Sequence, residues 1–169
     1  MARVEKIEWD ENLLETIDDL YRQVWNQSII ERLKKHLNYD GFRGYIMKSD
    51  AEKILGFSYG YSSRPGQYYH QLLSNELGPM KYEKWLEDCF EFVELTVHPA
   101  YRNQGYGKML IRELLKEVTN KTALLTTQVN NRSARNLYKG LGWVVVKEPF
   151  LPIKNDSPYV IMGKVLDKG

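Results

Sequence analysis

The sequence has little of what marks disulfide-bonded, secreted or membrane-spanning proteins. Its single cysteine, Cys89, excludes an internal disulfide and any zinc site built from several cysteines. No apolar run is long enough to cross a bilayer. The charged segment from Met1 to Lys6 also lacks the apolar stretch of a signal peptide. These absences predict a cytoplasmic protein, and we expect no bound metal.

A block of like charge is missing as well. The 24 basic and 22 acidic residues are well mixed and leave a net charge of +2. Even Lys34-Lys35 stands in a helical pattern with Glu31 and Arg32, which indicates a solvated helix face. Nucleic acid and acidic membranes therefore have no obvious docking surface, and we expect neither as a partner.

What the sequence does have is a regular succession of strand and helix patterns. Its 169 residues suit a single domain. The predicted order is strand, two helices, hairpin, then strand, helix, strand, helix and two final strands. The second helix is predicted to start at Ser28, where Glu31 would complete a capping box. Residues 45–47 and the alternating residues 55–61 predict the hairpin.

Residues 63–88 interrupt this succession. The segment 63–66 ends a strand, and Gly78-Pro79 breaks the chain again, which predicts two short helical pieces. A connection of this length is usually functional or mobile. Its aromatic side chains either line an acceptor site or pack the insertion onto the domain, and the sequence leaves both open. They are Tyr68, Tyr69, His70, Tyr82 and Trp85.

The most informative segment joins a predicted strand to the helix that follows it. Pro99 stops the strand, because proline cannot donate to a ladder. Gly105 and Gly107 let the backbone turn tightly and approach a ligand closely. The N–H groups of such a helix start form a natural phosphate site, to which Arg102 and Lys108 add charge. The spacing fits neither a dinucleotide fingerprint nor a P-loop.

Together with a second block downstream, this segment resembles the GNAT superfamily of N-acetyltransferases. The first family motif is matched by Val97, Pro99, Arg102, Gly105 and Gly107. The second, Asn-x-x-Ala-x-x-x-Tyr and then Gly-Phe, is matched by Asn131, Ala134, Tyr138 and Gly142, with Trp143 replacing the phenylalanine. The resemblance is specific over about residues 91–146.

The resemblance implies an α/β fold with a mixed, mostly antiparallel sheet of about seven strands flanked by helices. One strand pair in it should be parallel. The whole chain, 1–169, would then be a single GNAT-like acetyltransferase domain with an insertion at about 63–88.

The same resemblance implies an activity. The expected reaction moves an acetyl group from acetyl-coenzyme A to a primary amine of a small molecule or peptide, by direct attack in a ternary complex. Two alternatives stay open: a non-catalytic coenzyme A-binding sensor or interaction module, and a transferase with another acyl donor or acceptor atom. Relatives are often dimers, so a homodimer also stays open.

Cofactor-binding residues follow from the motif matches. In relatives, backbone N–H groups of the loop hold the pyrophosphate of coenzyme A. That role falls here on Arg102, Asn103, Gln104, Gly105, Tyr106, Gly107 and Lys108. The pantetheine arm pairs with the preceding strand through main-chain groups near Leu95 and Val97. Asn131 matches a position that commonly contacts the cofactor, and it also suits a helix N-cap.

Catalytic residues are implied in the same way. Tyr138 matches the usual general acid, which protonates the departing sulfur, although its spacing alone favours a place in the core. Glu91 and Glu94 are the candidate bases, and residues three apart on a strand face opposite sides. The family match favours Glu91, with Glu94 as second choice. Acceptor binding is assigned to Tyr59, Tyr69 and Trp85.

Overall fold

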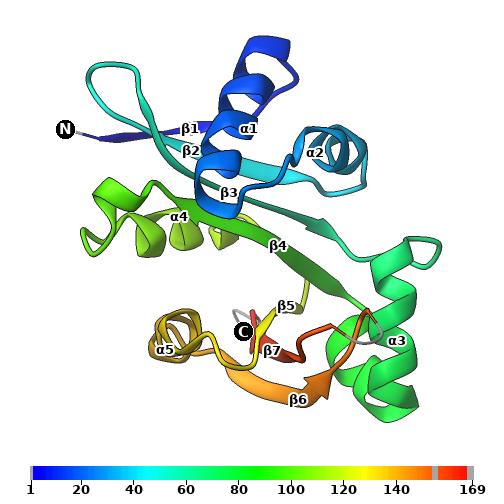
Figure 1. Cartoon of the computed structure of the whole chain (residues 1–169). Helices are drawn as coiled ribbons and strands as arrows, with labels where there is room; N and C mark the ends of the chain where they lie inside the picture. Colours follow the sequence, from blue (N-terminus) through cyan, green and yellow to red (C-terminus); the bar gives the residue numbers. More distant parts are fainter. Residues whose placement is uncertain (1, 154–155, 167–169) are drawn as a thin grey trace. The chain divides into compact units, whose positions relative to one another are not determined.

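Seven strands form one mixed sheet in the order β1-β2-β3-β4-β5-β7-β6 (Figure 1). The computed structural model describes residues 2–153 and 156–166. Neighbouring strands run antiparallel from β1 to β3 and among β5, β7 and β6, whereas β4 and β5 are parallel. The predicted α/β architecture, with its parallel pair, is therefore confirmed.

The helices and strands follow the predicted order along the chain. They are β1 (Arg3–Lys6), α1 (Glu11–Trp25), α2 (Ile30–Leu37), β2 (Arg43–Lys48), β3 (Ile54–Ser62), α3 (Tyr68–Lys81), the π-helix η1 (Tyr82–Leu86), β4 (Cys89–Val97), the 3-10 turn η2 (Pro99–Tyr101), α4 (Tyr106–Leu115), β5 (Thr122–Gln128), α5 (Arg132–Gly140), β6 (Val144–Phe150) and β7 (Tyr159–Val165). None of the helices within the described ranges is long and apolar enough to span a bilayer.

The chain divides into two compact units. The first comprises residues 1–61 and 93–118, and the second comprises residues 62–92 and 119–169. The boundary cuts through β4, so its start belongs to the second unit and its end to the first. The single domain inferred from the sequence stays a prediction.

In the first unit, helices cover both faces of the β1–β3 strands (Figure 1). Phe57 and Tyr59, alternate residues of β3, pack in a core with Leu14 of α1 and Leu33 of α2. Gly56 faces the other side, where an added Cβ would lie 2.8 Å from the Thr96 carbonyl oxygen and 3.3 Å from α4. A side chain at Gly56 would therefore separate β3 from its neighbours.

The start of α2 differs from the prediction. The helix begins at Ile30, and its N-cap residue, Ile29, provides no side-chain hydrogen bond. The cap comes instead from Asp18 of α1, which is 4% exposed. Its Oδ1 accepts from the Ser28 hydroxyl at 2.9 Å and from the N–H groups of Ile29 and Ile30 at 2.6 and 3.1 Å. The predicted capping box with Glu31 is wrong because a buried carboxylate from the neighbouring helix takes its place.

In the second unit, the insertion packs on the sheet. The kink at Gly78, with φ 75° and ψ 173°, precedes Pro79 and divides α3 into two pieces, as predicted. Buried Leu73 and Trp85 join a core with Leu124 of β5. The parallel register of β4 and β5 is present here, from Cys89–Thr122 to Glu91–Leu124.

Candidate active site

The loop after β4 presents backbone donors that the protein does not use. Gly105 is the N-cap of α4, has φ +83° and provides no side-chain cap. Within the described part of the chain, the N–H groups from Asn103 to Lys108 donate to no protein acceptor. Residues 102–105 and 108 are exposed and residues 106 and 107 are half-buried, so the loop is open to solvent. Such a helix start suits a phosphate group.

Positive charge surrounds this loop. Burial, and then the charges of Lys53 and Arg102, lower the pKa of His98, which is the N-cap of the η2 turn. Lys53 also lies over the Tyr101 ring, with its Nζ 5.4 Å from the ring centroid. The local potential therefore favours an anion, and the residues present fit the pyrophosphate of coenzyme A.

Glu94, on β4 in the same unit, is held by a short chain of hydrogen bonds. The Trp25 indole Nε1 donates to Thr96 Oγ1 at 3.1 Å, and Thr96 Oγ1 donates to Glu94 Oε1 at 3.3 Å. Because an indole can only donate, Thr96 must accept from Trp25 and is left with its own proton for Glu94. The chain thus orients the carboxylate with a donor on one oxygen.

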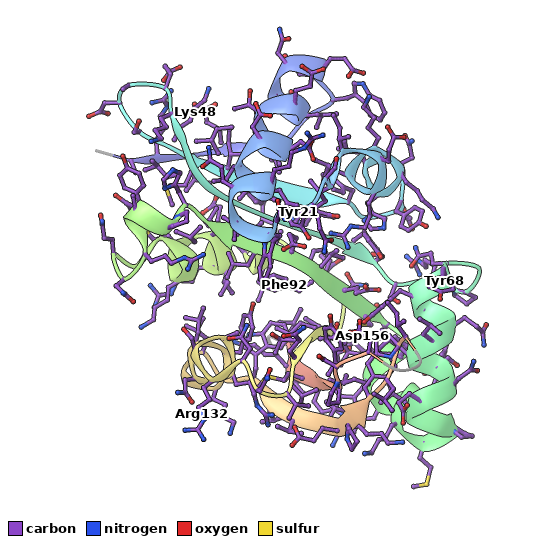
Figure 2. All side chains as sticks on the ribbon, in the orientation of Figure 1. Tyr21, Lys48, Tyr68, Phe92, Arg132 and Asp156 are labelled. Atoms are coloured by element: carbon purple, nitrogen blue, oxygen red, sulfur yellow. The ribbon has the colours of Figure 1, made fainter. Side chains whose placement is uncertain are left out.

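The second carboxylate oxygen of Glu94 faces an arginine. Arg32 Nη2, on α2, lies 3.4 Å from Glu94 Oε2 and donates to the Tyr21 hydroxyl at 3.1 Å. Tyr21 is labelled on α1 in Figure 2. The Glu94 side chain is only 12% exposed. Burial raises the pKa of Glu94 to about 7, against the opposing effects of the Arg32 charge and the Thr96 hydrogen bond.

Glu91 lies in a different environment. It is 5% exposed and belongs to the second unit. Its charge adds to the effect of burial in raising the pKa of the Cys89 thiol. That thiol is 1% exposed and packs in the core of the second unit, so Cys89 has no features of a nucleophile.

Tyr138 and Asn131 lie on α5 in the second unit. Tyr138 is 7% exposed, and its ring centroid lies 5.9 Å from that of Phe92 and 6.0 Å from that of Trp143. Asn131 caps α5, because its Oδ1 accepts from the Ala134 N–H at 3.1 Å. The capping role of Asn131 is confirmed, and its contact with the cofactor stays a prediction.

The three predicted acceptor-binding aromatics have packing contacts. Tyr59 is fully buried, and its hydroxyl is 2.9 Å from His36 Nδ1. The Tyr69 hydroxyl is 2.9 Å from Thr126 Oγ1. Trp85 is 8% exposed and packs so closely on Gly163 that an added Cβ there would lie 2.7 Å from the indole. A role in acceptor binding stays a prediction for all three.

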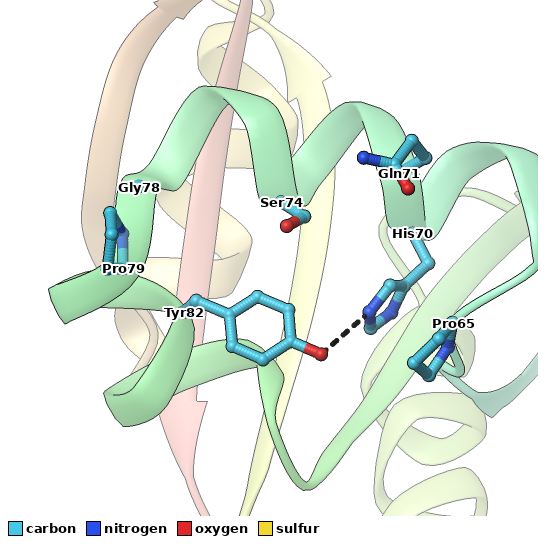
Figure 3. A pocket seen from close by; sticks show the side chains of 7 residues that line it. All are labelled: Pro65, His70, Gln71, Ser74, Gly78, Pro79 and Tyr82. Atoms are coloured by element: carbon cyan, nitrogen blue, oxygen red, sulfur yellow. Dashed lines mark hydrogen bonds between the residues drawn. The ribbon is translucent and has the colours of Figure 1, made fainter.

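An open cavity of about 460 Å³ lies beside α3 and η1 (Figure 3). It is lined by Pro65, His70, Gln71, Ser74, Gly78, Pro79 and Tyr82. His70 is 3% exposed, and its ring nitrogens hydrogen-bond to the Ser63 and Tyr82 hydroxyls at 2.8 and 3.1 Å. Burial lowers the pKa of His70. The lining has no Asp, Glu, Lys or Arg side chain. Through its two hydrogen bonds the His70 imidazole links Ser63 to Tyr82 and so holds the insertion together.

The sequence analysis did not predict three residues of this site, which are Arg32, Thr96 and Trp25. Arg32 read as part of a solvated helix face, and its carboxylate partner is 62 positions away. Trp25 and Thr96 are 71 positions apart. No local pattern marks contacts of this range.

The profile of the Acetyltransferase (GNAT) family matches residues 5–143. The chain therefore belongs to the GNAT family of acetyltransferases. A curated relative, a GCN5-like protein acetyltransferase of Mycobacterium tuberculosis, is 27% identical over 121 residues. That match covers 67% of this chain and 59% of the relative, so the chain spans less than two thirds of the relative's length.

Solved structures show the same fold at low sequence identity. The ribosomal-protein-S18-alanine N-acetyltransferase from Escherichia coli gives a TM-score of 0.73 at 14% identity, covering 100% of this chain and 96% of that chain. An aminoglycoside 6'-N-acetyltransferase complexed with coenzyme A gives 0.69 at 17% identity, covering 99% and 98%. A spermidine N-acetyltransferase chimera from Vibrio cholerae and hSSAT gives 0.69 at 15%, covering 98% and 95%.

Proposed function

We propose that this protein transfers an acetyl group from acetyl-coenzyme A to a primary amine, by direct attack in a ternary complex. The observation that carries the proposal is Glu94, a buried carboxyl group with a pKa of about 7, in the same unit as the loop of unused N–H donors. The three solved neighbours named above are all N-acetyltransferases, which supports an amine as acceptor.

The loop would hold the coenzyme. Its N–H groups from Asn103 to Lys108 suit the pyrophosphate, and Arg102 adds charge. Main-chain groups near Leu95 and Val97 would pair with the pantetheine arm, and Asn131 would add a side-chain contact. Bound acetyl-coenzyme A supplies the acetyl group as an activated thioester.

Glu94 would act as the general base. An amine can attack only after losing a proton, and a base works best when its pKa lies near the operating pH. Glu94 has such a pKa and is partly accessible. Glu91, the first choice from the sequence, is the alternative, but it lies beside the buried Cys89 thiol in the second unit. We therefore favour Glu94.

Tyr138 would act as the general acid. Glu94 takes a proton from the ammonium group, so the nitrogen can form the new N–C bond while the C–S bond breaks. The Tyr138 hydroxyl then donates its proton to the departing sulfur, and the excess proton on the acylated nitrogen passes through solvent to restore the Tyr138 hydroxyl. Packing against Phe92 and Trp143 fixes the ring in one orientation for this transfer.

A thiol-release assay with acetyl-coenzyme A tests the proposal. It would be run against amino acids, polyamines, aminoglycosides and peptide N-termini, with binding of acetyl-coenzyme A measured by calorimetry. Release that depends on one amine class supports the enzyme. Tight binding without release from any amine would favour the sensor instead, and release with a hydroxyl acceptor alone would favour the O-linked alternative. Absence of binding would refute both the enzyme and the sensor.

A further inference from the structure

Arg32 has hydrogen-bond donors that the protein leaves unused. Its side chain is 48% exposed, and its guanidinium carbon lies 5.9 Å from the centroid of the Tyr21 ring, which holds it in place. Among the described residues, the hydrogen bonds of the guanidinium come from Nη2 alone, to the Tyr21 hydroxyl and the Glu94 carboxylate. In the part of the chain that the structure describes, Nε and Nη1 donate to no acceptor. An arginine that is anchored on one side and open on the other can bind a second anion.

Burial lowers the pKa of Arg32, but Tyr59, Tyr21 and Glu94 raise it overall, so the guanidinium keeps its charge. Burial, and then the charges of Arg32 and Lys35, lower the pKa of His36 to about 4, so its ring is neutral at physiological pH. His36 Nδ1 lies 2.9 Å from the Tyr59 hydroxyl, and its ring packs on Tyr59 and on Tyr61. Glu94 is the one carboxylate that contacts Arg32 among the described residues. A ligand at this position would contact the Glu94 carboxylate, which is the proposed base, and the Arg32 guanidinium, which has unused hydrogen-bond donors.

We infer that the acceptor is an amine with a carboxylate next to its amino group, as in a free α-amino acid. Its ammonium would face Glu94 and its carboxylate would face Arg32, so each charge of the ligand meets an opposite charge of the protein. A polyamine would instead bring a second ammonium against Arg32, and a peptide N-terminus would offer only a neutral amide there. This inference rests on the proposed role of Glu94 as the base.

Matched acceptors test the inference. We would compare an α-amino acid, such as leucine, with its carboxamide and with its decarboxylated amine, in thiol release and in calorimetric binding to the protein loaded with coenzyme A. The amino group of the free acid is intermediate in basicity between those two analogues, so a preference over both cannot come from basicity. We expect a preference of about tenfold or more in kcat/KM and in Kd, as for a charge-assisted hydrogen bond.

Arg32→Gln should reduce this preference to within about twofold. The ratio between matched acceptors cancels any general loss of activity from the altered environment of Glu94. Lys34→Gln removes a charge from the same helix, where Lys34 pairs with Glu11 at 3.1 Å, and should keep the preference.

Equal or better use of the decarboxylated amine by the wild type would overturn the inference, as would a preference that survives Arg32→Gln. Failure of the proposed function is distinguishable from this. Thiol release would then be absent with all three acceptors, while calorimetry would still show whether the carboxylate is preferred and whether Arg32 is responsible.

Discussion

Thr96→Val tests whether Glu94 is the catalytic base. Valine has nearly the shape of threonine but lacks the hydroxyl that donates to Glu94 Oε1 at 3.3 Å. That hydrogen bond lowers the pKa of Glu94, which burial has raised to about 7. Its removal should therefore raise the pKa further.

The size of the shift follows from the lost hydrogen bond. A hydrogen bond to a charged group contributes about 1.5 kcal/mol or somewhat more, which corresponds to about one pKa unit. The base works only when deprotonated, so the acidic limb of the profile should move to higher pH. At about pH 6 the variant should be roughly tenfold slower than the wild type, and at about pH 9 the two should agree.

The assay is kcat/KM against pH, with the same acceptor for both proteins so that the ionisation of the acceptor cancels. Trp25→Phe is the matched control, because it removes the donor to Thr96 and leaves the Thr96 hydroxyl beside Glu94. The acidic limb of the Trp25→Phe profile should move less toward higher pH than that of the Thr96→Val profile. A wild-type profile without a limb near the pKa of Glu94 would refute Glu94 as base. A limb that Thr96→Val leaves in place would refute the reasoning about the hydrogen bond.

Three further variants address stability, the coenzyme loop and the acid. Asp18→Ala leaves the Ile29 and Ile30 N–H groups without their acceptor and should cost about 3 kcal/mol in urea unfolding at neutral pH. Burial opposes ionisation, but the Ile29 and Ser28 hydrogen bonds and Arg22 keep the pKa of Asp18 below its usual value, so the wild type should lose this advantage as pH falls through that lowered pKa. Gly105→Val forces a β-branched residue to φ +83°, although its Cβ meets no atom within 4 Å, and should weaken coenzyme A binding about tenfold in calorimetry. Tyr138→Phe keeps the packing on Phe92 and Trp143 and should bind acetyl-coenzyme A equally but turn over about a hundredfold more slowly. Unchanged turnover would remove Tyr138 from the mechanism.

The fold could be predicted from the sequence because its signals are local. Alternation in 55–61 marks β3, and Gly78-Pro79 marks the break in α3. The loop at Gly105 was found in the same way, since glycine adopts the positive φ of this helix start at little steric cost.

The environment of the base could not be predicted, because it depends on contacts between distant segments. Asp18 caps α2 in place of the predicted capping box, although it lies ten to twelve positions before the residues that it binds. Strand alternation separated Glu91 from Glu94 but gave no reason to prefer Glu94. That reason is burial together with Arg32, which the packing of α2 provides, and the Thr96 hydroxyl two residues along β4.

The opposing effects of burial and of Arg32 and Thr96 on the pKa of Glu94 also connect the choice of acceptor to the proton transfer. Full compensation by Arg32 and Thr96 would make Glu94 a permanent carboxylate with little affinity for a proton, and no compensation would keep it protonated. An acceptor carboxylate that binds Arg32 weakens the electrostatic interaction of Arg32 with Glu94, because one guanidinium then interacts with two anions. The ammonium of either acceptor lowers the proton affinity of Glu94, but only the acceptor with a carboxylate offsets this effect by engaging Arg32. The acidic limb of kcat, which reports the complex, should therefore lie at higher pH with the amino acid than with its decarboxylated amine. Limbs at the same pH for both acceptors would contradict the coupling.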